Sequence, residues 1–350
     1  MKNRILFASL IVALLLSTFV VVSGCGSVTG GGGGGGGGAA GSPWIYVGNE
    51  NNNSIMVIDG STNTTIEPID LVTYEPYSMA VSPDWKKIYC STGTYEVLII
   101  NTTNNTIEGS FTVINSQKSS GMVVSHDNEY LYMTGVSTNE FFKIYLNGGY
   151  TYETAALDAE SSRIALNSDS TKAYVCVNCD GNPADTRLNA VNLQTMTVES
   201  LSLLNKPHDL LVKDGYLYVT MHSLTGNLAI IKMSDFSIVD EIVFSPAREY
   251  WGIVNVPGTN KLYLSREIDA GEVHIATTSP GTIEFSSEII TGESFTYPGF
   301  MAATSKYVYV VDAFAVDKVV AINVASNSIE SYITGLNSQI YYCNPVVVYK

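Results

Sequence analysis

The stretch that decides the fold runs from residue 76 to residue 105 and reads PYSMAVSPDWKKIYCSTGTYEVLIINTTNN. Short apolar runs at 79–81, 88–90 and 97–100 are separated by polar turns, and a fourth extended run follows at 106–108. Runs of this length, rich in Val, Ile and Tyr and bounded by Ser, Pro, Asp, Asn and Gly, are typical of strands joined by tight turns. The stretch therefore predicts one four-stranded antiparallel unit.

The same unit recurs along the chain. A tyrosine marks the second strand of each copy, and consecutive marker tyrosines are 42 to 46 residues apart. A steady period of this length, filled with short strands and turns, is typical of β-propeller blades. We therefore expect an all-β fold, a seven-bladed β-propeller of four-stranded antiparallel blades. The seven marker tyrosines are Tyr46, Tyr89, Tyr132, Tyr174, Tyr218, Tyr263 and Tyr309.

The two ends of the repeat region indicate how the ring closes. The region opens with a second strand at 44–48 and ends just after a first strand at 345–349. Pairing of these two strands would complete one blade from both ends of the chain and leave no open sheet edge. We therefore place the propeller at residues 44–350 and expect the C-terminal strand to pair with the N-terminal blade.

The repeated units resemble the YVTN family of β-propellers, whose repeats combine a Y-V-T-N strand, a V-x-V-I-D strand, a T-x-T-N-T turn and a P-x-x-V-A-V-S-P-D-G link. The corresponding stretches are 218–220 (YVT), 55–59 (IMVID), 61–64 (STNT) and 76–84 (PYSMAVSPD), and Trp85 replaces the last glycine of the link. The resemblance covers nearly all of the repeat region. It implies an extracytoplasmic binding protein, although some enzymes carry such a ring as a metal or cofactor domain.

The N-terminus predicts export and lipid attachment. Two basic residues precede an apolar run at 5–22, and the sequence VSGC at 22–25 fits a lipoprotein cleavage site. We expect a signal peptide at 1–24 and a lipid on the thiol of Cys25. The alternative is a plain transmembrane anchor, because a run of this length could nearly span a bilayer.

A glycine-rich segment separates the expected signal peptide and lipidation site from the propeller. Residues 30–38 are all glycine, and such a sequence has no side chains to bury and high backbone entropy. We therefore interpret residues 25–43 as a lipidated cysteine followed by a flexible tether. Gly26 after Cys25 favours the outer membrane if the cell is Gram-negative, so the expected location is the cell envelope.

The charge of the chain limits its partners. The sequence has 18 basic and 33 acidic residues, a formal net charge of −15. A surface so acidic repels phosphate backbones and anionic lipids, which argues against nucleic acid and against membrane contact other than through the lipid anchor. The expected partner is an envelope or extracellular protein or a small ligand. Cys176 and Cys179 form a lone C-x-x-C, which indicates a local disulfide or two unreactive thiols rather than zinc.

Candidate binding residues follow from propeller topology. The loops that join consecutive blades, and those that join second to third strands, gather on one face around the channel mouth. In this chain they are acidic and aromatic, although packing at strand starts is the more usual role of such aromatic residues. The candidates are Tyr74, Glu75, Asp158, Glu160, His208, Asp209, His222, Tyr250, Trp251, Tyr297 and Tyr342.

Two histidines are predicted to meet at this mouth. If Asp214 and Gly215 form the turn between two strands, His208 lies beside Met221, one step from His222. With the neighbouring Asp209, two imidazoles and a carboxylate could bind a transition metal. The alternative is that His208 only caps a strand start and that His222 is a solvated loop residue. The sequence does not firmly imply any cofactor, but it allows a bound metal.

The sequence contains no motif for a nucleophile or a phosphate-binding loop. We therefore expect a non-catalytic binding or scaffolding module that uses the acidic, aromatic loop face. The alternative is a propeller enzyme, a lactonase-like hydrolase or a metal-dependent oxidoreductase, with a site at the channel mouth. A third possibility is a structural component of a surface layer.

Overall fold

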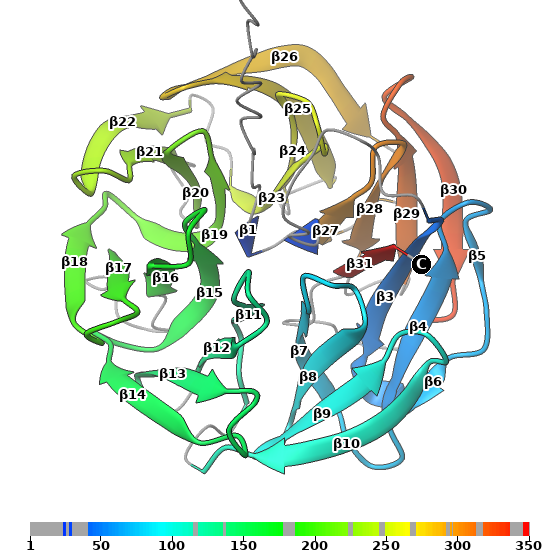
Figure 1. Ribbon diagram of the computed structural model, residues 1–350. Helices are drawn as coiled ribbons and strands as arrows, with labels where there is room; N and C mark the ends of the chain where they lie inside the picture. The colour runs from blue at the N-terminus through cyan, green and yellow to red at the C-terminus, as the bar shows by residue number, and fades with distance from the viewer. Residues whose placement is uncertain are drawn as a thin grey trace, which may run out of the picture.

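The computed structural model describes residues 24–25, 28–29, 41–114, 118–135, 138–177, 186–222, 227–244, 249–266, 271–291, 295, 297–312, 318–336 and 346–349. Seven sheets surround a central axis, as predicted for a seven-bladed β-propeller (Figure 1). In each blade the strands run antiparallel from an inner strand at the axis to an outer strand at the rim. The one helical element among the described residues is a 3-10 turn, η1 (Glu50–Asn52).

Blades 1 to 4 follow in chain order, apart from the inner strand of blade 1, which comes from the C-terminus. From the axis outward their strands are β31 (Val346–Tyr349), β3 (Pro43–Asn49), β4 (Ser54–Asp59) and the two short pieces β5 (Thr64–Thr65) and β6 (Ile69–Asp70) in blade 1; β7 (Pro76–Val81), β8 (Lys87–Thr92), β9 (Glu96–Asn101) and β10 (Thr106–Thr112) in blade 2; β11 (Met122–Val124), β12 (Tyr130–Thr134), β13 (Glu140–Tyr145) and β14 (Tyr152–Ala156) in blade 3; and β15 (Ser161–Leu166), β16 (Lys172–Val177), β17 (Arg187–Asn192) and β18 (Val198–Ser202) in blade 4.

Blades 5 to 7 repeat the arrangement. Their strands are β19 (Lys206–Lys213), β20 (Tyr216–His222), β21 (Asn227–Lys232) and β22 (Ser237–Val243) in blade 5; β23 (Tyr250–Asn255), β24 (Lys261–Arg266), β25 (Glu272–Ser279) and β26 (Thr282–Thr291) in blade 6; and β27 (Pro298–Ala303), β28 (Tyr307–Asp312), β29 (Lys318–Asn323) and β30 (Ser328–Thr334) in blade 7.

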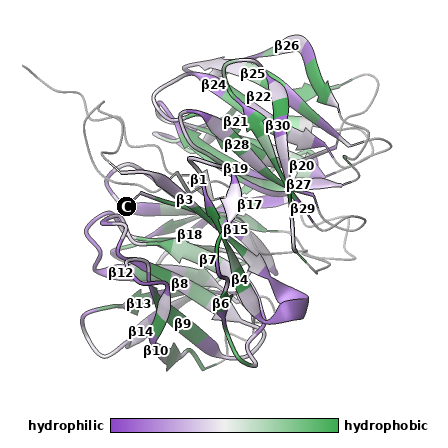
Figure 2. Cartoon of the chain, turned by 90° about the vertical axis from the view of Figure 1, so that its right-hand side faces the viewer, coloured by the Kyte–Doolittle hydropathy of each residue, from purple (hydrophilic) through white to green (hydrophobic). Residues whose placement is uncertain are grey.

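The core lies between the blades. All seven marker tyrosines fall in second strands and are at most 5% exposed. Second and third strands carry apolar residues on both faces because each blade is packed between two others. Figure 2 shows this as green strands inside the ring and purple, hydrophilic connections at its faces.

The ring closes as predicted. β31 pairs antiparallel with β3, with Trp44 opposite Val348 and Tyr46 opposite Val346. Val346, Val347 and Val348 are completely buried. Strands from both ends of the chain therefore form one blade.

Two short strands near the N-terminus also lie by the axis (Figure 1). β1 (Gly24–Cys25) pairs antiparallel with β19, and β2 (Val28–Thr29) pairs parallel with β31. The apolar run at 5–22 and the glycine run at 30–38 lie outside the described residues. In the uncleaved chain the expected processing bond, Gly24 to Cys25, is thus part of a strand.

The turns between third and fourth strands share one backbone feature in all seven blades. Each contains a residue with positive φ, between 48° and 76°. Asn and Gly tolerate this left-handed conformation best, and they occupy four of the seven positions. The seven residues are Asn63, Asn105, Tyr150, Met196, Phe236, Gly281 and Asn327.

Marker tyrosines bind these turns across the blade boundaries. The hydroxyl of Tyr46 donates to Asn105 Oδ1 of the next blade at 2.7 Å, and Tyr309 donates in the same way to Asn63 Oδ1 at 2.7 Å. Tyr263 donates to Asn327 Oδ1 at 2.8 Å. The repeated tyrosine and the repeated turn asparagine are therefore two halves of one contact between neighbouring blades.

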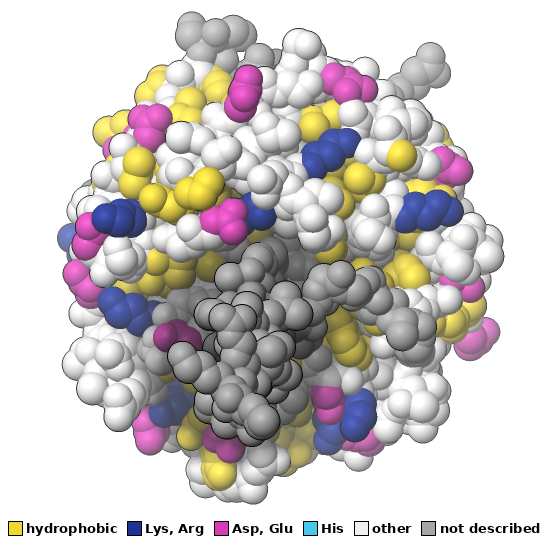
Figure 3. Space-filling view, turned by 45° about the horizontal axis from the view of Figure 1, so that its top comes forward, with side chains coloured by type: hydrophobic (Ala, Val, Ile, Leu, Met, Phe, Trp, Pro, Cys, Tyr) yellow, Lys and Arg dark blue, Asp and Glu magenta, His cyan; other side chains and the backbone are white. Residues whose placement is uncertain are grey.

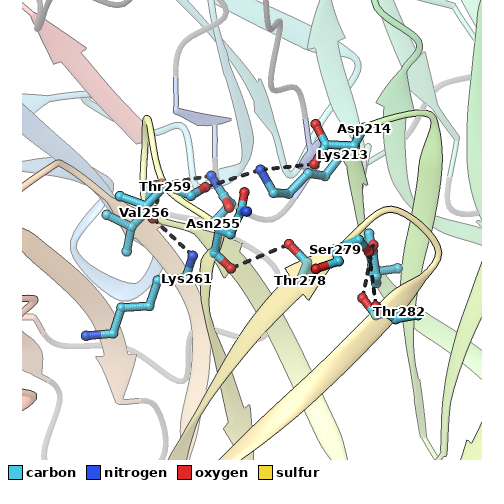
Figure 4. Close-up of polar contacts among 11 residues, drawn as sticks. Lys213, Asp214, Asn255, Val256, Thr259, Lys261, Thr278, Ser279 and Thr282 are labelled. Atoms are coloured by element: carbon cyan, nitrogen blue, oxygen red, sulfur yellow. Dashed lines mark hydrogen bonds and ion pairs between the residues drawn. The ribbon is translucent and has the colours of Figure 1, made fainter.

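Other contacts join neighbouring blades at the same face of the propeller. Tyr218 donates to the carbonyl of Ser279 at 3.0 Å in the turn that contains Gly281. Lys213 Nζ donates to the carbonyl of Thr259 at 3.2 Å, which also joins blades 5 and 6 (Figure 4). Tyr174 contacts Phe236 through its ring, with centroids 5.7 Å apart.

Removal of residues 344–350 deletes β31 and exposes the free edge of β3. Burial of three valines is worth about 4–9 kcal/mol by transfer free energies, a large part of the stability of an ordinary domain. We expect the melting temperature to fall sharply and unfolding to become less cooperative in calorimetry. The control is removal of Lys350 alone. An unchanged melting temperature after the longer deletion would show that β31 does not hold the ring closed.

Tyr309→Phe removes one hydroxyl bond between blades 7 and 1. We expect a loss of about 1 kcal/mol in the free energy of unfolding, measured with urea. Asn63→Gly keeps the left-handed turn but removes the acceptor, so the double variant should lose less than the two single losses combined. Tyr95→Phe, at an exposed tyrosine, is the control. Full additivity of Tyr309→Phe and Asn63→Gly would contradict a direct contact.

Candidate binding site at the channel mouth

The mouth is the face that carries the connections between blades and between second and third strands; the opposite face carries the remaining turns. At the mouth, the inner strands of blades 2, 4, 5, 6 and 7 begin with a β-bulge or a similar register shift. Such shifts bend a strand and redirect its side chains. The directions of the side chains near the axis are therefore set by irregular backbone and not by the simple alternation of a regular strand.

A hydroxyl in the second strand supports several of these shifts. Thr220 Oγ1 accepts from the amide of Asp209 at 3.0 Å and donates to the carbonyl of Trp251 in the next blade at 3.1 Å. Ser265 makes the corresponding pair of contacts with the amide of Gly252 and the carbonyl of Gly299. The Ser or Thr two residues after the marker tyrosine thus links neighbouring inner strands at the mouth.

The predicted turn at Asp214 and Gly215 is confirmed, but the predicted partner of His208 is wrong. Both turn residues have positive φ, and Lys213 pairs with Tyr216. The shift between Pro207 and Asp209 then places Pro207, not His208, opposite Met221. An extra residue at the bulge moved the register by one, which uniform counting from the turn could not reveal.

His208 belongs to a cluster of flat groups in contact with one another near the axis at the mouth. Its ring lies 4.1 Å from that of Trp251 and 5.7 Å from that of Phe300, centroid to centroid. The guanidinium carbon of Arg163 lies 3.5 Å from the centroid of the Phe300 ring. Arg163 comes from blade 4 and Phe300 from blade 7, so these contacts cross the axis between blades that are not neighbours.

Burial controls the charge within this cluster. His208 is 7% exposed, and its Nδ1 lies 3.1 Å from the carbonyl oxygen of Trp251. Burial, with the charge of Arg163 and the nearby His222, lowers the pKa of His208 to about 3. The imidazole is therefore neutral at physiological pH. Arg163 is 2% exposed and donates to the carbonyl of Ser120 at 2.6 Å.

Asp209 accepts hydrogen bonds from backbone amides. Its Oδ2 accepts from the amide of Ile253 at 3.0 Å, and its Oδ1 accepts from the amide of Leu210 at 2.9 Å. Burial raises the pKa of Asp209 to about 7, against the charge of Arg163 and these two amides. The carboxylate thus joins the inner strands of blades 5 and 6.

His222 is the accessible side chain of the site, and it lies beside the buried Glu249. His222 Nε2 lies 3.7 Å from Glu249 Oε1, and the His222 ring lies 6.3 Å from that of His208. The indole Nε1 of Trp251 is buried here without a hydrogen-bond acceptor. In the described ranges, no group of three or more His, Cys, Asp or Glu side chains is placed to hold a metal ion.

Asp158 serves the scaffold. Its carboxylate accepts from Asn189 Nδ2 at 2.7 Å and from Ser200 Oγ at 2.5 Å, and it pairs with Arg187 at 3.0 Å. Burial acts to raise the pKa of Asp158, but these hydrogen bonds and the Arg187 charge outweigh it and hold the pKa below its usual value. The connection between blades 3 and 4 is thereby fixed to the outer strands of blade 4.

The remaining predicted residues are dispersed around the ring. Tyr250 is fully buried and packs against Phe244 and Phe285, so it belongs to the core. Tyr297 is exposed, whereas Tyr74 and Glu160 are partly buried. Tyr342 lies outside the described residues, as do Cys179 and Cys343; Cys176 is buried.

The first two blades carry a separate charged group. Burial and the neighbouring carboxylate of Glu75 raise the pKa of Glu50, against the charge of Lys118. Figure 3 shows acidic, basic and apolar side chains interspersed over the described surface of one side of the molecule.

Sequence reasoning did not select three residues of the site. Arg163 and Phe300 lie in inner strands, and Glu249 lies in the connection before β23. Arg163 has a signal, because a charged residue interrupts the apolar run SSRIAL of β15. Phe300 has none, since an aromatic residue in an inner strand is indistinguishable from core.

Comparison with known proteins identifies the fold alone. No protein-family model and no curated protein sequence matches the chain. A functionally unknown protein from Desulfotomaculum acetoxidans is similar with a TM-score of 0.67 and 11% identity, over 86% of this chain and 99% of that one. Dihydro-heme d1 dehydrogenase NirN gives 0.63 and 11% over 88% and 75%, and Kuenenia stuttgartiensis hydrazine synthase gives 0.64 and 13% over 75% and 88%. No helix within the described segments is long and apolar enough to cross a membrane.

Asp158→Asn should weaken the fold most near neutral pH. A carboxyl whose pKa is lowered by folding adds stability above its unfolded pKa, near 4, and loses it as the pH falls through the folded pKa. We expect a deficit of about 1–2 kcal/mol at pH 7, reduced by partial exposure, that disappears in acid. Urea unfolding from pH 7 to pH 2.5 measures it. Asp240→Asn, at an exposed aspartate of β22, is the control. A deficit that persists unchanged in acid would exclude a charge-dependent role for Asp158.

Proposed function

We propose that the protein is a non-catalytic binding or scaffolding propeller, anchored to the cell envelope by a lipid on Cys25, which engages a partner at its mouth. The propeller fold supports a binding role in general. One observation carries the choice of face: large apolar side chains are 39% to 72% exposed in the mouth connections of several blades or at the strand ends beside them. They are Val72, Tyr95, Ile114, Leu204, Val243 and Tyr297.

These exposed groups favour a protein as the partner. Most polar groups around the axis already serve the scaffold: Asp209 binds backbone amides, Asp158 binds Arg187, and Asp312 accepts from the amide of Tyr297 at 2.7 Å. Apolar side chains in a polar rim are the usual composition of a recognition surface. A folded envelope protein presents surface of matching size, whereas a small ligand would touch only one or two of these residues.

Val72 is the most exposed of these apolar residues. It is a β-branched residue with φ of 64°, and it is 72% exposed. A β-branched residue is strained in this conformation, so its turn has to hold it there. The turn that holds it is fixed by Asp70 Oδ1, which accepts from the Val72 amide at 2.8 Å.

Site-specific photo-crosslinking in the producing cells tests the proposal. A photoreactive residue at Ile114 or Leu204 should give one discrete adduct, because both lie in mouth connections. The same residue at Thr103 or Ser326, in turns of the opposite face, is the matched control. Leu204→Glu should reduce the Ile114 adduct at least several-fold while the melting temperature stays unchanged. Adducts of equal yield from both faces would refute a specific mouth surface.

The second candidate is an enzyme with its site at the mouth, a lactonase-like hydrolase or a metal-dependent oxidoreductase. It is favoured by the approach of His222 to Glu249, beside a neutral His208 whose Nδ1 is held by a carbonyl. Two structurally similar proteins, hydrazine synthase and dihydro-heme d1 dehydrogenase NirN, are named as enzymes. A stoichiometric metal in the purified chain, whose removal by a chelator lowers the melting temperature, would favour this candidate over the binding module.

A further inference from the structure

We infer that the folded chain protects its own processing site, so that lipid attachment and cleavage at Cys25 come before the N-terminal segment pairs with the inner strands. The inference rests on the lipid anchor of the proposed function and adds the order of events. It follows from the pairing of β1 and β2 near the axis (Figure 1).

The bond expected to be cleaved lies in an extra strand on the inner edge of blade 5. Gly24 pairs with Leu211 and Cys25 with Leu210, near the middle of β19. The other edge of β19 pairs with β20, where Leu210 lies opposite Val219. β1 is thus the fifth strand of this sheet, and it also lies beside β15 of blade 4. The backbone on both sides of the bond is therefore held among inner strands.

The residues that follow the bond are held as well. Val28 pairs with Val346 and Thr29 with Val347, in parallel orientation. Val346 and Val347 are completely buried and belong to β31, the strand that closes the ring. β2 also lies beside β27 of blade 7. The processing site is therefore flanked by inner strands of blades 1, 4, 5 and 7.

Both reactions of processing need access to this segment. In cleavage, the hydroxyl of a water molecule goes to the carbonyl carbon of Gly24 and its proton goes to the nitrogen of Cys25, which becomes a free amine. In lipid attachment, the sulfur of Cys25 bonds to the glyceryl carbon of a phospholipid, and the headgroup phosphate leaves with the thiol proton. A segment that is paired in a folded sheet reaches an enzyme only when it opens. Pairing at the axis therefore slows both reactions.

The order of the chain leaves a period in which the site is free. β1 pairs with a strand at 206–213 and β2 with a strand at 346–349, whereas the site itself is near the N-terminus. In a chain exported from its N-terminus, the site emerges before either partner strand. Contacts of such long range form late because their loop entropy is large. A new chain can therefore be processed before the ring closes, and a chain that folds first is processed slowly.

The test compares chains of different age in cells that make the protein. The enzyme that transfers the lipid is depleted, the precursor made in that period is pulse-labelled, and the enzyme is then restored. These aged chains have had time to fold, so we expect them to receive lipid about tenfold more slowly than chains labelled after the enzyme is restored. Incorporation of a labelled fatty acid and the shift to the mature size measure the two reactions.

A proline variant tests whether pairing causes the delay. Val28→Pro with Thr29→Pro removes both amide donors of β2 and leaves the sequence VSGC at 22–25 intact. Aged chains of this variant should receive lipid several-fold faster than aged unmodified chains, with an unchanged melting temperature. Gly33→Pro with Gly34→Pro, in the glycine run, is the matched control and should leave the delay in place.

Two kinds of result would overturn the inference, and they are distinguishable. Equal rates for aged and new chains, or no gain in the variant with prolines at 28 and 29, show that folding does not protect the site, while the lipid anchor stands. If neither aged nor new chains receive more fatty acid than Cys25→Ser, the anchor itself is refuted, and the inference with it.

Discussion

The hydrogen bond from a second-strand tyrosine to the turn of the next blade is the contact on which the regular ring depends. It joins the most constant residue of the repeat, exemplified by Tyr309, to a turn whose left-handed residue, Asn63, can accept it. The contact fixes the distance between blades at the opposite face, while second-strand hydroxyls such as Thr220 do so at the mouth. Blades 6 and 7 are held together at both faces in this way, by Tyr263 and by Ser265, and buried tyrosine rings and aliphatic residues pack between the blades.

Where the tyrosine contact is altered, the blades keep the same packing by other means. Tyr174 meets Phe236 through its ring, and Tyr218 meets a backbone carbonyl. The left-handed turn position persists even when it holds Met196 or Tyr150, residues that favour it much less than Asn. The geometry of the turn is therefore a stronger requirement than the identity of the side chain, which explains how the repeat can drift without loss of the fold.

The fold could be predicted from the sequence because its determinants are local and repeated. The marker tyrosines set the period, and the two half-blades at the ends imply the closure between β3 and β31 that the structure shows. The site could not be predicted to the same degree. Arg163, His208 and Phe300 come from three different inner strands, and their meeting depends on shifts in register that no local pattern reports. Asp158 is a candidate binding residue by its charge, but in the structure its carboxylate pairs with Arg187 and accepts a hydrogen bond from Asn189 within the scaffold.

The mouth combines contacts across the axis with exposed apolar side chains in its connections. Arg163, Phe300, His208 and Trp251 link blades across the axis, so we expect these contacts to restrain relative movement of the blades. A partner would meet a stiff surface with little ordering cost on this side of the interface. That property suits a protein that presents a fixed platform to something larger than itself.

Closure through β31 also determines when folding can finish. Tyr46 pairs with Val346, so about 300 residues separate the two halves of blade 1, and a contact of this range forms late because its loop entropy is largest. A chain that is threaded through a membrane from its N-terminus cannot complete the ring until its last residues have emerged. The same strand that removes the open edge therefore ties completion of the ring to the last residues of the chain.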